Sequence, residues 1–496
     1  MNKNNWRLQY HLMPPSGWLN DPNGLCQYRG QYHVFFQYSP NEPGPDGRKA
    51  RTWGHYAGPD LLHLSFQGVP FWPVRPENHD GCYSGSALVP DKGAAANPDR
   101  RGTDGPADDG KDESVRLYYT GNVKEPGNHD YTYSGRQANE ILVLMDSRGR
   151  FSEGSVVLKN ADYPSDCTCH VRDPKVWKQD GKYFMVLGAR VAGGDRKEDT
   201  DYGEVLLYSG PDGVQWKLER RIRSSERFGY MWECPDYFEL GHEKFLGICP
   251  QGVPSEEFRY QNIYEAGYWH VDGGTDGELR LHDFLEWDYG FDFYAPQTFV
   301  DESGRRLLIG WVGMPDAPYR NATADCDPYW ENCLTVPREL TLKDGNILQN
   351  PVRELTQLRM NRTVFESEGT VTFPKGSGDA EVHFLDPEGQ KKWEIRFGTD
   401  VLLRYAGGVL SLKLSEKAGC GRDLRKCRIP EIRSLRILAD TSVLEIYVND
   451  GEAVMTTRYY PDYDPVLPSL DVSFLCPRAD ISCWEMKTME TNKKLQ

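Results

Sequence analysis

Three acidic residues stand in short polar motifs that lie far apart in the sequence. Asp21 occurs in the run Asn-Asp-Pro-Asn-Gly, Asp173 follows an arginine and precedes a proline, and Glu233 precedes Cys-Pro. Hydrolysis of a glycosidic bond needs two carboxyl groups: one attacks or stabilises an oxocarbenium-like carbon and the other protonates the leaving oxygen. The three residues are candidates for this chemistry if the fold brings them together.

The neighbours of each acid predict different roles. Asp21 lies in a tight polar turn whose donors can keep a carboxylate ionised, as a nucleophile requires. Glu233 follows Phe-Gly-Tyr-Met-Trp at 228–232, an apolar neighbourhood that disfavours the charged form and suits a proton donor. The fixed charge of Arg172 favours an ionised Asp173, which could accept bonds from sugar hydroxyls and stabilise developing positive charge.

Each motif alone is also typical of an ordinary turn or of a salt-bridged strand start. Five segments, however, share one layout: a polar motif, an alternating strand, a turn and a second strand. Successive motifs lie 63, 89, 60 and 61 residues apart, at Asp21, Ser84, Asp173, Glu233 and Tyr294. The long interval contains residues 90–114, which are rich in Gly, Pro and charge and lack apolar periodicity. We interpret them as an insertion in a turn of the second repeat.

All-β repeats of about 60 residues predict a five-bladed β-propeller built from four-stranded antiparallel sheets. Equivalent strands of successive blades begin at the same end of the central channel, so this architecture would bring the three acids together. We expect the propeller at residues 1–340 and a linker at 341–358. Residues 359–496, with strands every ~8 to 12 residues, predict a β-sandwich with a structural or cavity-rim role, because they carry no cluster of acids.

Charge and hydropathy narrow the classes of partner. Lys plus Arg number 58 against 74 Asp plus Glu, a formal charge of −16, which disfavours nucleic acid and anionic membrane surfaces. No apolar run approaches the ~18 residues of a spanning helix, and the start of the sequence lacks the apolar segment of a signal peptide. We therefore expect a soluble, cytoplasmic protein; its oligomeric state is left open.

The aromatic residues indicate the kind of ligand, and the cysteines indicate whether the chain carries disulfides or a metal site. Thirteen Trp and 28 Tyr in an acidic chain suit a neutral ligand such as a sugar, although most must pack a β core. Twelve cysteines spread over 496 residues without a secretion signal indicate reduced thiols. The cluster Cys167-Thr-Cys-His170 has no second pair of ligands nearby, so we interpret it as structural thiols and expect no metal site.

Four motifs in order carry a family resemblance: Trp18–Gly24 (WLNDPNG), Tyr83–Ser86 (YSGS), Arg172–Pro174 (RDP) and Glu233–Pro235 (ECP). They resemble the signatures of glycoside hydrolase family 32, the β-fructofuranosidases, which include invertases, sucrose-6-phosphate hydrolases, inulinases and levanases. The similarity continues through 53–55, 292–297, 310–311 and 335–340 to 448–452, so it covers essentially the whole chain.

The resemblance implies a five-bladed propeller with a C-terminal β-sandwich, and hydrolysis with retention through a covalent fructosyl-enzyme. It implies that Asp21 is the nucleophile, Glu233 the general acid/base and Asp173 the transition-state stabiliser. It implies no metal or organic cofactor. The residues that would bind the fructose unit are Trp18, Leu19, Asn20, Gln37, Tyr83, Ser84, Arg172, Tyr294 and Trp311.

One segment departs from the family pattern. Many members carry an extra Trp between the positions of Gln37 and Trp53, where it forms a sugar platform, but SPNEPGPDGRKART contains no aromatic residue. We therefore expect the part of the pocket that binds the leaving group to differ from that of other family members. Arg48, Lys49 and Arg51 in this segment could meet a sugar 6-phosphate; a solvated loop is the alternative interpretation.

The sequence thus predicts an exo-acting β-fructofuranosidase whose partner is a small sugar: sucrose, sucrose 6-phosphate or a short fructooligosaccharide. An inulin- or levan-type fructan hydrolase and a fructosyltransferase are the close alternatives. An inverting arabinan or xylan hydrolase and a sugar-binding propeller without activity are the remote ones.

Overall fold

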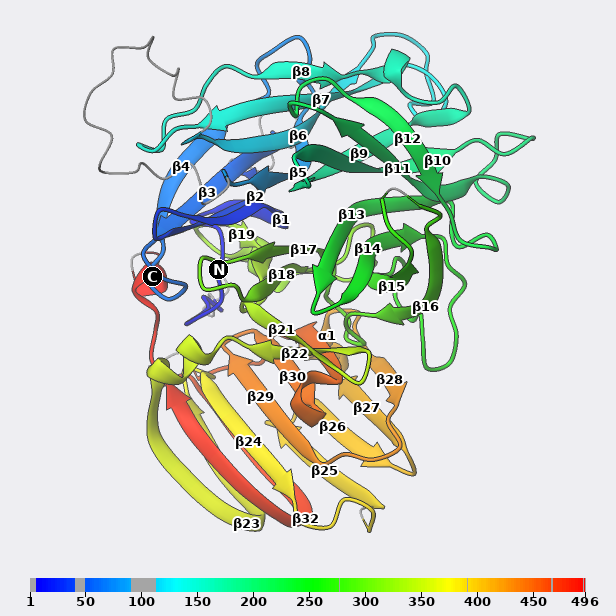
Figure 1. Ribbon diagram of the computed structural model, residues 1–496. Helices are drawn as coiled ribbons and strands as arrows, with labels where there is room; N and C mark the ends of the chain where they lie inside the picture. The colour runs from blue at the N-terminus through cyan, green and yellow to red at the C-terminus, as the bar shows by residue number, and fades with distance from the viewer. Residues whose placement is uncertain are drawn as a thin grey trace, which may run out of the picture.

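The computed structural model describes residues 6–40, 50–90, 113–275, 277–389, 391–464, 467–493 and 495. It is almost entirely β-structure, arranged as a ring of blades above a two-layered sandwich (Figure 1). The predicted fold class, a five-bladed propeller followed by a β-sandwich, is confirmed. No helix in the described ranges is long and apolar enough to cross a membrane.

Each blade is an antiparallel sheet that begins at the channel and runs outward. Blade I contains β1 (Gly17–Tyr28), β2 (Gln31–Ser39), β3 (Thr52–Gly58) and β4 (Ser65–Phe71). Blade II contains β5 (Cys82–Leu88), β6 (Val115–Lys124), β7 (Arg136–Met145) and β8 (Ser155–Leu158). Blade III contains β9 (Cys167–Gln179), β10 (Lys182–Val191), β11 (Tyr202–Gly210) and β12 (Lys217–Ile222). Blade IV contains β13 (Met231–Leu240), β14 (Glu243–Gln251), β15 (Gly267–Asp272) and β16 (Arg280–Glu286).

Blade V extends beyond the expected domain boundary at residue 340. It contains β17 (Tyr294–Val300), β18 (Arg306–Val312), β21 (Arg338–Lys343) and β22 (Asn346–Pro351), with β20 (Cys333–Leu334) paired to β18. The segment 341–358, expected as a linker, thus supplies an outer strand, because β22 pairs with β21 along its whole length. Only the short helix η5 (Arg353–Leu358) leads from there into the sandwich.

The predicted insertion at 90–114 joins β5 to β6, and its residues 91–112 lie outside the described residues. Alternating side chains of each sheet pack against the two neighbouring blades. In blade II, Tyr119 and Ile141 belong to the core shared with blade I, whereas Tyr118 and Leu142 belong to the core shared with blade III. This period-two pattern is what stacks the sheets into a ring.

The innermost strand of every blade carries a register shift at its polar motif. The shifts fall at residues 20–21, 83–84, 173–174, 234–235 and 295–296. Such bulges bend a strand and redirect its side chains, and they often lie next to active sites. The motifs therefore lie inside the innermost strands at equivalent bulges in β1, β9 and β13, not at the strand starts as the sequence predicted.

Among the described residues, no strand belongs to the sheets of both the first and the last blade. Instead, β19 (Trp330–Glu331), from the loop after β18, pairs in parallel with Gly17 and Trp18 of β1. Gln297 of blade V also donates to Gly85 O at 2.9 Å and accepts from Leu25 N at 3.2 Å. The ring is thus closed by short contacts near the channel.

Two long strands run through both sheets of the sandwich. β32 (Ser469–Met486) pairs with β25 through residues 472–475 and with β24 through residues 479–485, and β23 (Arg359–Pro374) accompanies it throughout. The other strands are β24 (Gly378–Phe384), β25 (Lys392–Phe397), β26 (Val401–Ala406), β27 (Val409–Leu414), β28 (Leu424–Arg428), β29 (Ser434–Asp440), β30 (Val443–Val448) and β31 (Ala453–Arg458). Besides η5, the described residues form the short helices η3 (Asn160–Asp162), η4 (Ala322–Asp325), α1 (Glu416–Gly419), η6 (Asn449–Gly451) and α2 (Glu490–Lys493).

A buried ionic network joins the sandwich to the propeller. His11 bridges Asp440 (Nδ1 to Oδ2, 2.8 Å) and Glu445 (Nε2 to Oε1, 2.9 Å), and all three side chains are fully buried. Glu445 also pairs with Arg338 of blade V at 2.7 Å. Although burial opposes it, hydrogen bonding to both carboxylates raises the pKa of His11 to about 9.

The N-terminal segment is held by residues near position 490. Met489 N donates to Gln9 O at 2.8 Å, and Asn492 Nδ2 donates to Leu8 O at 3.1 Å and to His11 O at 2.9 Å. Figure 1 shows the two chain ends on the same side of the molecule. We call this set of contacts the terminal clasp.

Candidate active site

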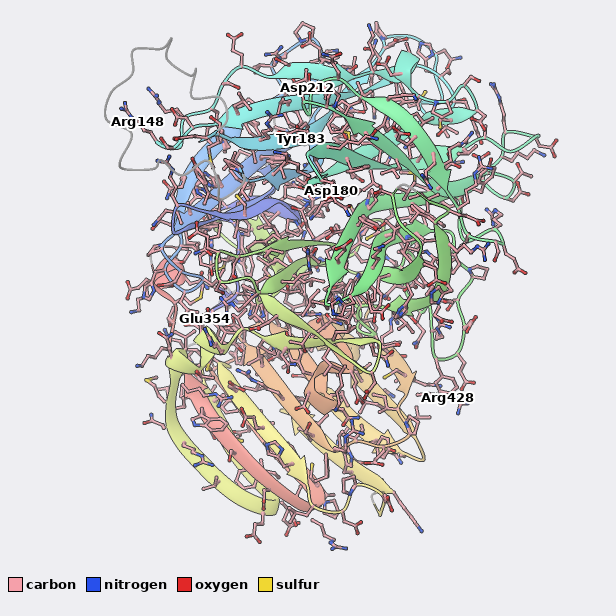
Figure 2. All side chains as sticks on the ribbon, in the orientation of Figure 1. Arg148, Asp180, Tyr183, Asp212, Glu354 and Arg428 are labelled. Carbon is pink, nitrogen blue, oxygen red and sulfur yellow. The ribbon has the colours of Figure 1, made fainter. Side chains whose placement is uncertain are left out.

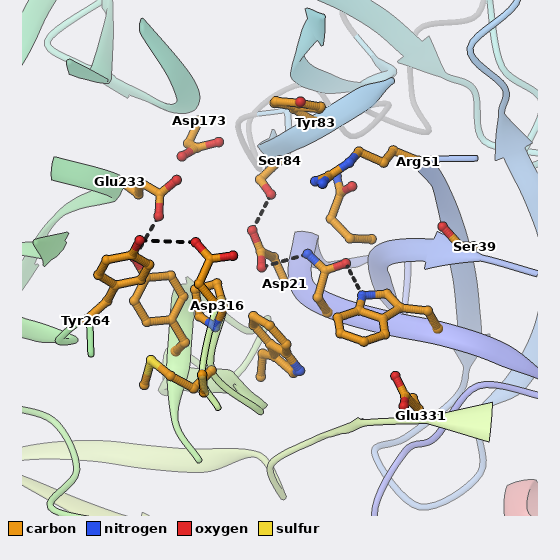
Figure 3. A pocket seen from close by; sticks show the side chains of 18 of the residues that line it. Asp21, Ser39, Arg51, Tyr83, Ser84, Asp173, Glu233, Tyr264, Asp316 and Glu331 are labelled. Atoms are coloured by element: carbon orange, nitrogen blue, oxygen red, sulfur yellow. Dashed lines mark hydrogen bonds between the residues drawn. The ribbon is translucent and has the colours of Figure 1, made fainter. Parts of the chain in front are cut away.

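A cavity of about 760 Å³ opens at the channel end where the five bulges meet. Its lining includes Asp21, Asp173 and Glu233, which reach one space from three different blades (Figure 3). The other sequence-predicted residues that line it are Trp18, Asn20, Gln37, Tyr83, Ser84, Arg172, Tyr294 and Trp311.

Leu19 is the predicted residue that does not reach the cavity. Its side chain is fully buried in the apolar core beneath blades I, IV and V. Neighbouring side chains of a strand point to opposite faces, so Trp18 and Asn20 can line the cavity only if Leu19 points away. The motif was correctly located, but the assignment of Leu19 to the sugar pocket was wrong.

Asp21 is held by two donors at the bulge of β1. Ser84 Oγ donates to Oδ2 at 2.5 Å and Asn20 Nδ2 donates to Oδ1 at 3.0 Å, while Asn20 itself accepts from Trp18 Nε1 at 3.0 Å (Figure 3). Burial nevertheless raises the pKa of Asp21; the two hydrogen bonds oppose this shift and the charge of Glu233 adds to it. The expected donors are present, but they do not outweigh desolvation.

Asp173 is fixed through both its backbone and its carboxylate. Its N–H donates to Thr120 Oγ1 at 3.0 Å, and Oδ2 accepts from Cys234 N at 3.0 Å. Burial raises its pKa to about 7; Arg172 opposes the shift, whereas the carboxylates of Glu233 and Asp21 add to it. As expected, the charge of Arg172 favours the ionised form of Asp173, but it does not outweigh burial and the neighbouring carboxylates.

Arg172 pairs mainly with Glu233. Its Nη2 and Nε donate to Glu233 Oε1 at 2.6 and 3.1 Å, whereas its nearest distance to Asp173 is 3.9 Å. Tyr294 OH and Gln251 Nε2 donate to Glu233 Oε2 at 2.6 and 2.8 Å. The surroundings of Glu233 are thus polar, whereas the sequence predicted an apolar neighbourhood.

The reason for this difference is the alternation of β13. The preceding Trp232 is fully buried in the core between blades III and IV. The adjacent Glu233 points to the opposite face, where its partners come from β9, β14 and β17. Flanking residues in a strand therefore say little about the surroundings of the side chain between them.

Several lining residues were missed or misinterpreted. His170, assigned to a thiol cluster, is a wall residue whose Nδ1 accepts from Arg172 Nη1 at 2.7 Å. Burial and the nearby arginines lower its pKa well below the ordinary value, so its ring is neutral. Other missed residues are Arg136, Gln251, Tyr264, Asp316, Tyr319, Arg320, Asn321 and Glu331. They come from edges and loops without motif signals, and only the fold identifies them.

The arginines near the mouth form a cationic corner. Arg136 and Arg51 line the cavity beside Arg172, and the guanidinium of Arg51 lies 5.2 Å from the ring centre of Tyr83. Burial, with the charges of Arg172 and Arg51, lowers the pKa of Arg136. The other members of the basic segment, at 48 and 49, lie outside the described residues.

Within the described ranges, no group of three or more His, Cys, Asp or Glu side chains could hold a metal ion. Cys167 and Cys169 are free thiols. The cavity is lined by carboxyl groups, with arginine, tyrosine and amide donors around them. Two carboxyl groups beside one bond match the requirement for glycoside cleavage.

Comparison with known proteins agrees with this chemistry. Residues 11–351 match the model of the glycosyl hydrolases family 32 N-terminal domain, and residues 409–476 match the family 32 C-terminal model. The sucrose-6-phosphate hydrolase of Bacillus subtilis (strain 168) is 34% identical over 470 residues, covering 92% of this chain and 89% of that protein. The raffinose invertase of Escherichia coli is 34% identical over 481 residues, covering 93% and 91%.

Solved structures match both modules. The sucrose-6-phosphate hydrolase from Lactobacillus gasseri has a TM-score of 0.81 at 26% identity, covering 98% of this chain and 94% of that one. A β-fructofuranosidase of Bombyx mori has a TM-score of 0.78 at 26% identity, covering 98% and 95%. The chain is a glycoside hydrolase, and it belongs to glycoside hydrolase family 32.

Proposed function

We propose that this protein is a retaining, exo-acting β-fructofuranosidase that removes a terminal, non-reducing fructosyl unit from sucrose, sucrose 6-phosphate or a short fructooligosaccharide. The observation that carries the proposal is the meeting of Asp21, Asp173 and Glu233, from three blades, around one cavity. The names of the similar proteins support the sugar class. A cytoplasmic location stays a prediction.

In the first step, Asp21 attacks the anomeric carbon of the fructosyl unit while Glu233 donates its proton to the glycosidic oxygen. The carbon–oxygen bond breaks, the leaving sugar departs with the proton, and an ester bond to Asp21 forms. Asp173 accepts hydrogen bonds from fructose hydroxyls and stabilises the positive charge that develops on the ring.

In the second step, Glu233 takes a proton from water, whose oxygen attacks the anomeric carbon and releases Asp21 as a carboxylate. Arg172 and Tyr294 hold Glu233 in place for both proton transfers, since both donate to its carboxylate. Two displacements at one carbon leave its configuration unchanged.

The test compares wild type with Asp21→Asn and Glu233→Gln. Each variant should fold but lose at least about a thousandfold in kcat for sucrose, since each loses one half of the paired chemistry. Asp180→Asn, at the exposed β9–β10 turn (Figure 2), is the matched carboxylate control and should keep full activity. The first fructose released, followed by NMR, should be the β-furanose.

Near-wild-type rates for either catalytic variant would refute the residue roles. An α-fructofuranose as first product would favour the inverting alternative, and sucrose binding without turnover by the wild type would favour a sugar-binding propeller.

A phosphate on the leaving sugar fits the cationic corner. Arg136 Nε is buried and has no hydrogen-bond partner among the described residues, although a guanidinium in such a place normally pairs with an acid. A charge-assisted bond to phosphate is worth about 1.5–3 kcal/mol. We therefore propose that sucrose 6-phosphate is preferred to sucrose.

We expect Arg136→Gln to lower kcat/KM for sucrose 6-phosphate about tenfold to hundredfold while changing kcat/KM for sucrose much less. Arg148→Gln, an exposed arginine of the β7–β8 turn (Figure 2), is the control and should change neither. An equal loss on both substrates would assign Arg136 to the fold and not to phosphate.

A further inference from the structure

Two polar side chains interrupt the apolar interface between blades II and III. Thr120 of β6 and Glu140 of β7 are direct register partners and lie on the face whose neighbours Tyr118 and Leu142 belong to the apolar core. Both are buried, and Glu140 is not exposed at all. No ion pair joins it to a cationic side chain of the described residues, and a buried glutamate in such a place is costly.

These side chains form a hydrogen-bonded relay that ends at a catalytic acid. Asp173 N donates to Thr120 Oγ1 at 3.0 Å, and Thr120 Oγ1 donates to Glu140 Oε2 at 2.9 Å. The second oxygen of Glu140 lies 3.2 Å from Tyr163 OH, which lies 3.1 Å from Ala138 O. Thr120 thus links a buried carboxyl group to the backbone of the bulge.

The backbone of Asp173 needs such a support. Its φ of +66° lies in the left-handed region, and Pro174 follows it. Non-glycine residues in this region cost about 1–3 kcal/mol and keep their conformation only when several contacts fix them. The bonds from Asp173 N to Thr120 and from Cys234 N to the carboxylate fix it from opposite ends.

Glu140 can fill this place without adding a buried charge. Burial raises its pKa to about 8; the hydrogen bonds of Thr120 and Tyr163 oppose the shift, and the charge of Asp173 adds to it. Tyr208 is the further titratable side chain on which the charge of Glu140 acts. A neutral carboxyl can accept from Thr120 with one oxygen and donate to Tyr163 with the other, while Tyr163 donates to Ala138 O.

We propose that Glu140, acting through the hydroxyl of Thr120, is a positioning residue that holds Asp173 in its bulged conformation. The inference rests on the proposed function, from which the role of Asp173 is taken. Neither residue lines the cavity, so both act on the sugar only through Asp173.

The test measures kcat and KM for sucrose together with thermal unfolding. Thr120→Val keeps the shape but removes the acceptor of the Asp173 N–H, and Glu140→Leu removes the acceptor of the Thr120 hydroxyl. Because small misplacements of a catalytic group are costly, each should lower kcat about tenfold to hundredfold. Thr120→Ser and Glu140→Gln keep the relay and should restore kcat to within about threefold of wild type.

Tyr163→Phe is the matched control. It removes a hydrogen bond to Glu140 on the side away from Asp173, so it should lower the melting temperature but not kcat. Equal losses of kcat in Tyr163→Phe and Thr120→Val, or a wild-type kcat in Thr120→Val, would overturn the proposal. If Glu140→Leu does not fold, the comparison of Thr120→Val with Thr120→Ser tests the proposal by itself. A wild type that hydrolyses neither sucrose, nor sucrose 6-phosphate, nor a short fructooligosaccharide would refute the proposed function instead.

Discussion

Each of the three acids that line the cavity has its own set of hydrogen-bond partners. The spacing of the motifs, together with the family resemblance, predicted that Asp21, Asp173 and Glu233 meet in one site, because the motifs fall at the same phase of three blades. Their electrostatic surroundings could not be predicted in the same way. The donors to Glu233 come from positions 172, 251 and 294, and no local sequence window contains them together.

We expect Ser84→Ala to shift the pH dependence of the enzyme. Ser84 Oγ donates to the Asp21 carboxylate and thereby lowers a pKa that burial raises. Without this bond Asp21 binds its proton more tightly, so the ionised nucleophile exists only at higher pH. The acid limb of kcat/KM for sucrose should therefore move to higher pH.

Ser86→Ala is the control for this shift. Its hydroxyl donates to Pro174 O at 2.7 Å and not to a carboxylate. If the acid limb of kcat/KM lies at the same pH in Ser84→Ala and in the wild type, the ionisation of Asp21 does not determine this limb.

At the scale of elements, the strands and their bulges position the residues of the site. The phase of the five motifs and most of the sandwich strands followed from alternation and turn residues in the sequence. The bulges did not, because a register shift depends on which residues of the partner strand are opposed. Gly188 opposes Arg172 and Val186 opposes Lys175, which leaves Asp173 and Pro174 without partners. Such pairing is a property of two strands together.

A buried ion pair links the two strands that carry Asp173 and Glu233. Lys175 Nζ of β9 lies 2.9 Å from Asp236 Oδ1 of β13, and Asp236 Oδ2 accepts from Thr298 N of β17 at 2.5 Å. Removing one partner of a buried pair leaves an uncompensated charge, at a cost of about 3–5 kcal/mol. The pair therefore ties blades III, IV and V together beneath the cavity.

We expect Lys175→Met and Asp236→Asn each to lower the free energy of unfolding by about 3 kcal/mol. The double variant should lose clearly less than the sum, because it removes both charges and keeps an acceptor for Thr298 N. Urea unfolding of the four proteins measures this coupling. Additive losses would show that the two charges do not stabilise one another.

At the scale of the whole molecule, the sandwich packs against the first, fourth and last blades. The core beneath blades I, IV and V also contains Leu438, Tyr447 and Val454 of the sandwich. The sequence predicted two modules and a structural or cavity-rim role for the second. It could not predict this shared core, because its members lie several hundred positions apart and only the closed ring brings them together.

The ionic network between the modules should make stability depend on pH. The pKa of His11 is raised to about 9, so its contribution is complete below about pH 6.5 and is lost as the pH rises through 9. The unfolding free energy of the wild type should fall by about 3 kcal/mol between pH 6.5 and 9. In His11→Gln this fall should be much smaller.

His63→Gln is the control, since His63 is half-exposed and its ion pair with Asp60 lies at the surface. Its unfolding should keep the wild-type dependence on pH. A pH-dependent loss that is the same in His11→Gln and wild type would assign the effect to other groups.

The terminal clasp has a consequence for how the protein matures during synthesis. The contacts of Met489 and Asn492 fasten residues 8–11, which are translated some 480 positions earlier. While the ribosome is still reading the end of the sandwich, the blades can form one after another, but residues 8–11 still lack their partners at positions 489 and 492. A nascent chain arrested before residue 489 should therefore be more sensitive to proteases near its beginning than a chain that contains residues 489–492, and it should gain full resistance only once those late residues have emerged from the exit tunnel.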